Sequence, residues 1–182
     1  MAVWSSFLKR DEIALEYWDR LRALRPQDAK VVSKIAHLKA GAGERLQAIT
    51  LLRQSIALDP EDAAAWFNLG FLQQEEGDHE DALASFQRAI ELDPKLDRAW
   101  YGTALSMIKM GRVEDAIAPL KRNTELQPMS PFGWYQLAHV YHRLGDSERV
   151  ARVIRTLSEF EPEVARQLER ETGVNVGVDM PF

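Results

Sequence analysis

Apolar residues recur at spacings of three and four along most of the chain, with charged residues between them. This spacing places apolar side chains on one face of a helix. In residues 63–76 that face consists of Trp66, Leu69, Gly70 and Gln73. In residues 79–92 it consists of Ala82, Leu83, Phe86, Ala89 and Ile90. Gly77 separates the segments and can take the left-handed conformation that ends a helix, so the pattern predicts a helical hairpin.

The same pattern repeats along the chain with a period of 34 residues. Prolines at this interval are Pro26, Pro60, Pro94, Pro128 and Pro162. Glycines in the same register are Gly43, Gly77, Gly111 and Gly145. A fixed period of this size is typical of a solenoid, in which each unit buries its apolar face against its neighbours. We therefore predict four hairpins, at residues 29–62, 63–96, 97–130 and 131–164.

The segments on either side of these hairpins are predicted to cap them. The second helix of a hairpin has a small residue, a large residue and a following proline at fixed positions. In residues 1–28, the equivalent positions are occupied by Ala14, Trp18 and Pro26. These residues predict a lone N-terminal capping helix. The stretch 163–172 has a polar face and is followed by Gly173, which predicts a C-terminal capping helix. We assign residues 165–182 to this cap and to an extended tail. Caps of this type keep a solenoid from stacking without limit.

Apolar and polar residues alternate in the last stretch of the sequence, a period of two that suits an extended segment. The apolar set is Val174, Val176, Val178, Met180 and Phe182. Such a tail could lie in a groove of its own chain or of a neighbouring copy. The alternative is a frayed terminus in which the alternation arose by chance.

Two local signals concern the ends and the interior of helices. Asp62 and Asp78 precede the two helices of the 63–96 hairpin, and aspartate side chains accept hydrogen bonds from free N–H groups at a helix start. Pro119 lies inside the predicted second helix of the 97–130 hairpin, where proline removes a backbone hydrogen bond and clashes with the preceding turn. We therefore expect Asp62 and Asp78 to cap their helices, and we expect a kink in the helix that contains Pro119.

The 63–96 hairpin carries the motifs Trp66-x-x-Leu69-Gly70 and Ala82-x-x-x-Phe86, followed by Pro94. These closely resemble the tetratricopeptide repeat pattern, which prefers Tyr where Gln73 stands. The other hairpins match less fully, with Val32 and Thr103 in place of the usual Trp and Leu. The resemblance implies an all-α fold: a right-handed superhelical solenoid of four helical hairpins with N- and C-terminal capping helices. It also implies a concave groove in which segments of partner proteins bind.

Composition and charge restrict the partners. The 182 residues are 46% hydrophobic and 28% charged, which is typical of a soluble globular protein, and no stretch is apolar enough to insert into a membrane. A net charge of −5 argues against nucleic-acid binding, which requires a basic face. The absence of cysteine fits a reducing compartment, and the first ten residues lack the features of a signal peptide. We expect a cytoplasmic protein.

Sequence motifs of catalysis and cofactor binding are missing, so we expect neither an enzyme nor a cofactor. His139 and His142 share a helix face and could chelate a metal ion, but no third ligand of suitable type is close in the sequence. We therefore favour polar groove-lining side chains and assign no metal site. A metal-binding role for this histidine pair is kept as a minor alternative.

A second apolar stripe follows the first helices of the hairpins, about 100° around from the face that packs inside them. In the resembled family, this stripe faces the groove. The predicted partner-binding residues are Phe67, Phe71, Arg98, Tyr101, Leu105, Ile108, Phe132, Tyr135, His139 and His142. An exposed apolar patch usually marks an interaction site. The alternative is that packing between neighbouring first helices already covers part of it, for example Phe71 or Leu105.

The ligand and the function follow from this stripe and from the resemblance. Some members of the family hold the carboxylate of a chaperone's last residue with basic and amide side chains, and only Asn68 and Arg98 match that arrangement here. An apolar or amphipathic segment of a protein or peptide partner is therefore favoured. We expect a non-catalytic interaction scaffold. The alternatives are a self-assembling structural oligomer and a secretion- or assembly-type chaperone for a client protein.

Overall fold

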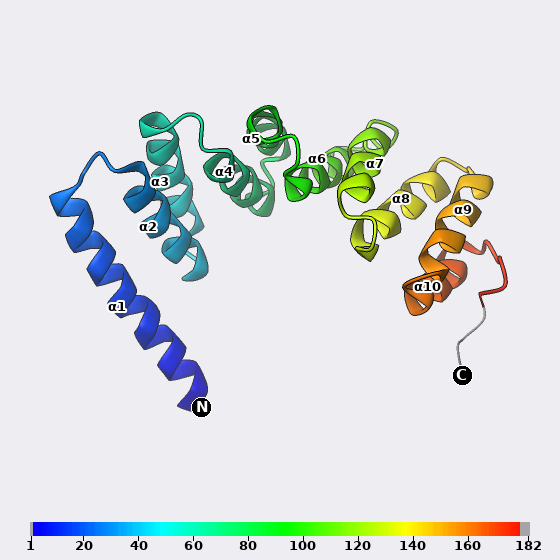
Figure 1. The fold of residues 1–182 in the computed structure, drawn as a ribbon, viewed down its shortest axis with the longest axis horizontal. Helices are drawn as coiled ribbons and strands as arrows, with labels where there is room; N and C mark the ends of the chain where they lie inside the picture. The colour runs from blue at the N-terminus through cyan, green and yellow to red at the C-terminus, as the bar shows by residue number, and fades with distance from the viewer. Residues whose placement is uncertain (1, 179–182) are drawn as a thin grey trace. The chain divides into compact units, whose positions relative to one another are not determined.

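The computed structural model describes residues 2–178, with side chains described from Ile13 onward, and this part of the chain is all α-helical. It forms two compact units, one ending at Asp93 and the other beginning at Pro94, and each is described on its own. The first unit contains α1 (Ala2–Leu24), α2 (Ala29–Gly41), α3 (Arg45–Leu58), α4 (Ala63–Glu76) and α5 (His79–Leu92). The second contains α6 (Asp97–Lys109), α7 (Ile117–Leu126), α8 (Pro131–Arg143), α9 (Ser147–Ser158) and α10 (Pro162–Thr172) (Figure 1).

The first unit consists of two hairpins and the long helix α1. Helix α2 pairs with α3 and α4 pairs with α5, while α3 packs on α4 and α1 packs on α2 (Figure 1). The core between the hairpins includes Ala36, Ala48, Leu52, Ala65 and Leu69. Helix α1 therefore covers one side of the α2/α3 hairpin, as expected of an N-terminal capping helix.

The second unit repeats this arrangement and ends differently. Helices α6 and α7 pair, as do α8 and α9, and α7 packs on α8. Helix α10 lies against both α9 and α8 (Figure 1). Its Ala165 and Leu168 are fully buried in the core of this unit. The C-terminal helix thus occupies the side of the last hairpin that would otherwise lie open.

The 34-residue spacing of prolines has a direct structural counterpart in the tryptophans. The indole N–H of Trp66 donates a hydrogen bond to the carbonyl oxygen of Pro60, at 2.9 Å. Trp100 does the same with Pro94 at 3.1 Å, and Trp134 with Pro128 at 2.9 Å. Each bond satisfies the indole donor of a partly buried ring and fixes the turn between two hairpins. The proline and the tryptophan are therefore parts of one contact.

Close packing inside the hairpins pairs a small residue with a large one. A Cβ atom added to Gly70 of α4 would lie 2.8 Å from Cδ1 of Phe86 in α5. Phe86 is fully buried, so its ring fills the space that a larger residue at position 70 would need. The glycine allows the two helices to approach closely.

The structure confirms most of the predicted helix ends and corrects two. Asp62 accepts hydrogen bonds from the N–H groups of Ala64 and Ala65, as expected, whereas the side chain of Asp78 makes no cap bond. The prediction that Pro119 lies in the interior of a helix was wrong, because α7 begins only at Ile117. Pro119 then lies in the first helical turn, where N–H groups have no partner within the helix. Because the helix starts late, the proline removes no hydrogen bond within it.

Candidate partner-binding surface

The predicted partner-binding residues lie on α4, α6 and α8, the first helices of their hairpins. The first unit holds Phe67 and Phe71, both on α4. The second unit holds Arg98, Tyr101, Leu105 and Ile108 on α6, and Phe132, Tyr135, His139 and His142 on α8. The two groups belong to separate compact units and are considered separately.

On α4, the two phenylalanines form a stacked pair with ring centroids 6.5 Å apart and an interplanar angle of 28°. Phe67 also lies 5.9 Å from the ring of Phe86, so the interior of the hairpin takes up part of its surface. Phe71 keeps 46% of its surface exposed. The pair therefore presents one supported aromatic ring to solvent.

On α6, packing within the second unit uses much of the predicted stripe. Tyr101 and Ile108 are half-buried against the apolar core, and Leu105 is half-buried as well. Burial raises the pKa of the Tyr101 hydroxyl, and a hydrogen bond to Gln136 of α8 acts in the opposite direction. The core of the second unit thus takes up part of the surface of Tyr101 and Ile108. Arg98 at the start of this helix is exposed.

At the start of α8, two large apolar side chains three residues apart in the sequence are exposed. Phe132 has 68% of its surface accessible, and Met129 in the preceding turn has 67%. Pro131 occupies the first position of the helix, where its missing N–H costs no intrahelical bond. The second unit therefore offers its own aromatic side chain to solvent.

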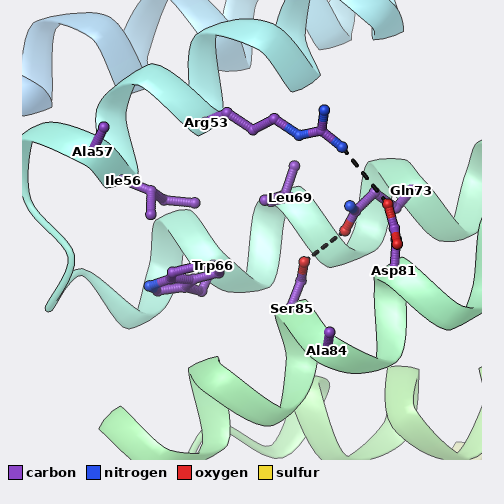
Figure 2. Close-up of a pocket in the computed structure, with 9 residues that line it drawn as sticks. All are labelled: Arg53, Ile56, Ala57, Trp66, Leu69, Gln73, Asp81, Ala84 and Ser85. Atoms are coloured by element: carbon purple, nitrogen blue, oxygen red, sulfur yellow. Dashed lines mark hydrogen bonds and ion pairs between the residues drawn. The ribbon is translucent and has the colours of Figure 1, made fainter.

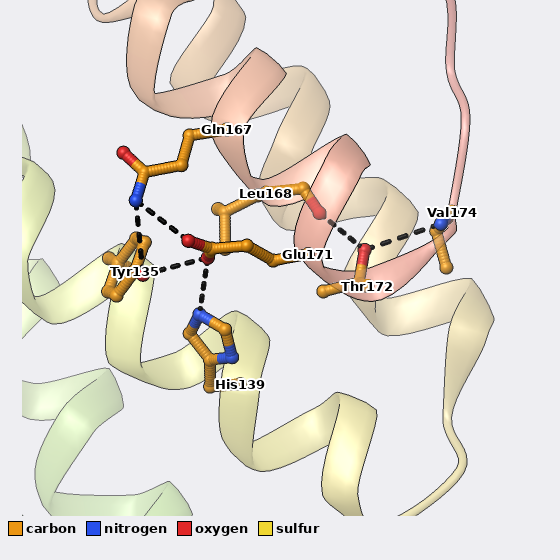
Figure 3. A network of polar contacts seen from close by, with 7 residues as sticks. All are labelled: Tyr135, His139, Gln167, Leu168, Glu171, Thr172 and Val174. Carbon is orange, nitrogen blue, oxygen red and sulfur yellow. Dashed lines mark hydrogen bonds and ion pairs between the residues drawn. The ribbon is translucent and has the colours of Figure 1, made fainter.

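Further along α8, Tyr135 and His139 are bound to α10 through Glu171, which the sequence analysis did not single out. The Tyr135 hydroxyl donates to Oε2 of Glu171 at 2.7 Å, and Nε2 of His139 lies 3.0 Å from the same oxygen (Figure 3). The amide of Gln167 donates to Oε1 of Glu171 at 2.8 Å. The rings of Tyr135 and His139 also meet edge to face, with centroids 4.6 Å apart and an interplanar angle of 63°. These contacts join the two helices.

The electrostatics of this cluster follow from its hydrogen bonds. Bonds from Gln167 and Tyr135, together with His139, favour the carboxylate and hold the pKa of Glu171 below its ordinary value. The hydrogen bond to Glu171 also raises the pKa of Tyr135, because loss of its proton would place two negative groups together. His142 is exposed and has no place in the cluster. Among the side chains that the structure describes, residues 13–178, no three His, Asp or Glu are grouped so as to hold a metal ion.

Comparison with known proteins identifies the repeats. A family model described as "Tetratricopeptide repeat" matches residues 63–96, and a second one, "TPR repeat", matches residues 42–77. Residues 42–96 therefore consist of tetratricopeptide repeats. No curated protein matches it by sequence.

Solved structures show that the tetratricopeptide fold extends beyond the matched residues. MamA 41-end from Desulfovibrio magneticus RS-1 is 19% identical with a TM-score of 0.75, and the match covers 93% of both chains. YrrB, described as a TPR protein with an unusual peptide-binding site, is 18% identical with a TM-score of 0.76 over 93% of this chain and 88% of that one. The first TPR of Spaghetti (RPAP3), bound to the HSP90 peptide SRMEEVD, is 18% identical with a TM-score of 0.63, covering 65% and 94%.

The extended tail of the chain folds back on its own unit. Val174, Val176 and Val178 are half-buried against the core of the second unit. Oε1 of Glu169 accepts the backbone N–H groups of Val176 at 2.7 Å and Gly177 at 2.9 Å. The alternating valines are thus part of the folded unit as far as residue 178. Met180 and Phe182, the other two members of the alternating set, lie outside the described residues.

A pocket of about 380 Å³ lies between α3, α4 and α5 (Figure 2). Its floor includes Gln73, the residue that departs from the tetratricopeptide pattern, and the Gln73 side-chain oxygen accepts a hydrogen bond from Ser85 at 2.6 Å. At the rim, a guanidinium nitrogen of Arg53 lies 3.7 Å from the carboxylate of Asp81. Both the polar pair in the floor and the charged pair at the rim are thus matched.

Within residues 2–178, no helix is both long and apolar enough to cross a membrane.

Proposed function

We propose that this tetratricopeptide repeat protein is a non-catalytic interaction scaffold, and that the first helices of its hairpins bind an apolar or amphipathic segment of a partner. The observation that carries the proposal is an exposed phenylalanine on a first helix in each unit, Phe71 and Phe132. Exposed apolar patches of this kind usually mark an interaction site. Burial of two or three aromatic anchors is enough for a peptide complex of modest affinity.

The comparisons support a peptide as the ligand class. The structures of YrrB and of the Spaghetti domain are both described in terms of peptide binding, and this chain shares their fold. In the second unit, the proposed residues also include Arg98, Tyr101, Leu105 and Ile108 on α6 and His142 on α8. We assign the anchoring role to Phe67, Phe71 and Phe132. Tyr135 and His139 have a smaller share in it, because their polar atoms already contact α10.

The titratable groups support a non-catalytic role. A cluster of such groups, formed by Tyr135, His139 and Glu171, holds α8 and α10 together. The contact between the two helices explains the arrangement of these three side chains. A cytoplasmic location and a chaperone-like activity remain predictions from the sequence.

The proposal is tested by selecting binders from a displayed library of random dodecapeptides against the whole chain. We expect the selected peptides to be apolar or amphipathic. The variant F71S/F132S should weaken their binding at least about tenfold, since each buried aromatic anchor contributes on the order of 1 kcal/mol or more. The matched control is L46S/L144S, which removes one exposed leucine from each unit outside the proposed surface.

Circular dichroism should show the same helicity for both variants. Equal binding by F71S/F132S and the wild type would contradict the proposal, as would a library that yields only peptides without apolar side chains.

The second candidate function, self-association, is supported by a specific feature of α1. Ile13, Tyr17 and Leu24 are largely exposed and lie within about 40° of one another around the helix. An unpartnered apolar stripe on a capping helix could join copies of the chain. Light scattering over a range of concentrations should show a mass increase that I13S/Y17S abolishes. A constant monomer mass in the wild type would remove this candidate.

A further inference from the structure

The second unit contains a pocket that neither the sequence analysis nor the proposed function uses. It has a volume of about 400 Å³ and lies between α7, α8 and α9. Its apolar walls include Trp134, Leu137 and Val153, and its floor includes Tyr141, which is 4% exposed. The pocket can therefore take up a large apolar side chain, because most of its inner surface is hydrocarbon or aromatic ring.

The pocket in Figure 2 is formed by the equivalent residues two repeat periods earlier. The rims of the two pockets differ in charge. Where the first unit has Arg53, Asp81 and Ala84, the second has Lys121, Arg149 and Arg152. In the first unit the single cation faces the single carboxylate, at 3.7 Å. The rim in the second unit holds three cations.

The acidic groups near the second pocket reduce this excess of positive charge without cancelling it. Glu125, the acidic residue of its lining, is paired with Arg122 at 2.9 Å. Arg149 contacts Asp146, the residue that precedes α9, and Arg152 contacts Glu148 within α9, both through pairs that are open to solvent. Exposed pairs of this kind contribute little stability, so a ligand carboxylate can compete for the guanidinium groups. Each guanidinium also has more N–H donors than one carboxylate can use.

Arg149 is held in position by the pocket itself. Its guanidinium carbon lies 5.3 Å from the centroid of the Tyr141 ring, a distance at which a cation is attracted to an aromatic face. The charge therefore stands at the border between the apolar walls and the solvent. A ligand that fills the pocket with an apolar group would bring a neighbouring anionic group next to Arg149.

We propose that this pocket binds an acidic peptide segment that carries one large apolar side chain. The apolar side chain enters between Trp134 and Leu137, and the flanking carboxylates contact Arg149, Arg152 and Lys121. This site lies between the second helices α7 and α9 and one face of α8, and it excludes Phe132 and the residues of α4 and α6. It is therefore a second binding surface, independent of the one proposed above.

The test uses a capped, fluorescent heptapeptide with a central phenylalanine flanked on each side by two glutamates. Its binding to the whole chain is measured by fluorescence anisotropy. R149A/R152A should weaken binding at least about tenfold, and raising the salt concentration should weaken binding to the wild type. The control R53A/R88A removes the same charge from the first unit and should change the affinity less than about twofold.

The remaining comparisons separate the proposal from general attraction and from the first-helix surface. A peptide with alanine at the centre should bind at least about tenfold more weakly, because it leaves the apolar walls unfilled. D81R/A84R, which gives the first pocket the rim of the second, should add a second binding equivalent. Equal loss in both double arginine variants, equal binding of the alanine peptide, or no binding by the wild type would overturn the proposal. Loss of this peptide in F71S/F132S would assign it to the first-helix surface instead.

Discussion

Helices α4 and α8 hold the same place in the repeat, two periods apart, yet they present different surfaces. On α4 the outward positions are Phe67 and Phe71, a stacked apolar pair whose outer ring is exposed. On α8 the same positions are Tyr135 and His139, whose polar atoms contact Glu171 of α10. The difference shows that a repeat position does not fix a role. Its use depends on the residue type and on what packs against it within the unit.

The interiors of the same two hairpins differ in a complementary way. In the first unit Gly70 faces Phe86, whereas the corresponding residues in the second unit are Ala138 and Ile154. All four positions are buried. A smaller residue on the first helix is thus combined with a larger one on the second, which keeps the packed volume similar.

The largest loss of stability should come from a substitution that weakens the packing of α10 on α8. Leu168 is fully buried in the second unit, so Leu168→Ala should lower the free energy of unfolding by about 2–5 kcal/mol. Truncation of the exposed Phe71 to alanine should cost less than about 1 kcal/mol. Urea unfolding measures both. A smaller loss for Leu168→Ala than for Phe71→Ala would show that α10 is not essential to the second unit.

A smaller loss is expected from Gly70→Ala. The added methyl group would press on the buried Phe86 ring, and we expect about 1–2 kcal/mol of destabilisation after the gain in helix propensity. The double variant Gly70→Ala/Phe86→Leu copies Ala104 and Leu120 of the third hairpin and should recover most of that loss. Thermal unfolding would decide. No rescue by the second substitution would contradict the paired-volume interpretation.

Glu171→Gln should have a still smaller effect, restricted to the second unit. The side chain keeps its shape but loses the charge that Tyr135 and His139 contact, which should cost about 0.5–1 kcal/mol at this partly exposed site. Glu163→Gln, on the exposed face of the same helix, serves as the control. Hydrogen exchange of the α10 amides should increase in the first variant only, and equal exchange in both would contradict the bridging role.

The smallest effect is the dependence of this bridge on pH. The folded-state pKa of Glu171 is lowered from its ordinary value of 4.5, so the unfolded chain binds more protons in this range. The stabilisation is therefore fully present above pH 4.5 and is lost as the pH falls through the folded-state pKa. The stability difference between the wild type and Glu171→Gln should shrink on acidification. A difference that stayed constant would indicate that the carboxylate is not titrating against this cluster.

Most of the hairpin architecture follows from the sequence because its signals are local and repeated. The 34-residue spacing of prolines fixes the turns, and each turn then supplies the carbonyl that Trp66, Trp100 or Trp134 contacts. Pro119 was misjudged because the rule against proline in helices assumes that the helix has already begun. The local pattern did not show that α7 starts late, at Ile117.

The candidate site was predictable only in part, since it depends on contacts between distant segments. Glu171 stands where the repeat pattern has Leu69 and Leu137, and this departure was the one signal for the α8–α10 bridge. The difference between the two pocket rims was also present in the sequence, at Asp81 and Arg149. The sequence alone did not show that these two residues line equivalent pockets.

The most direct test of the account is photo-crosslinking of a library-selected peptide to a benzoylphenylalanine placed at position 71 or at position 139. The account predicts that the peptide is crosslinked from position 71, whereas the group at position 139 reacts with the chain's own residues 162–172. Crosslinking of the peptide from position 139 and not from position 71 would contradict it.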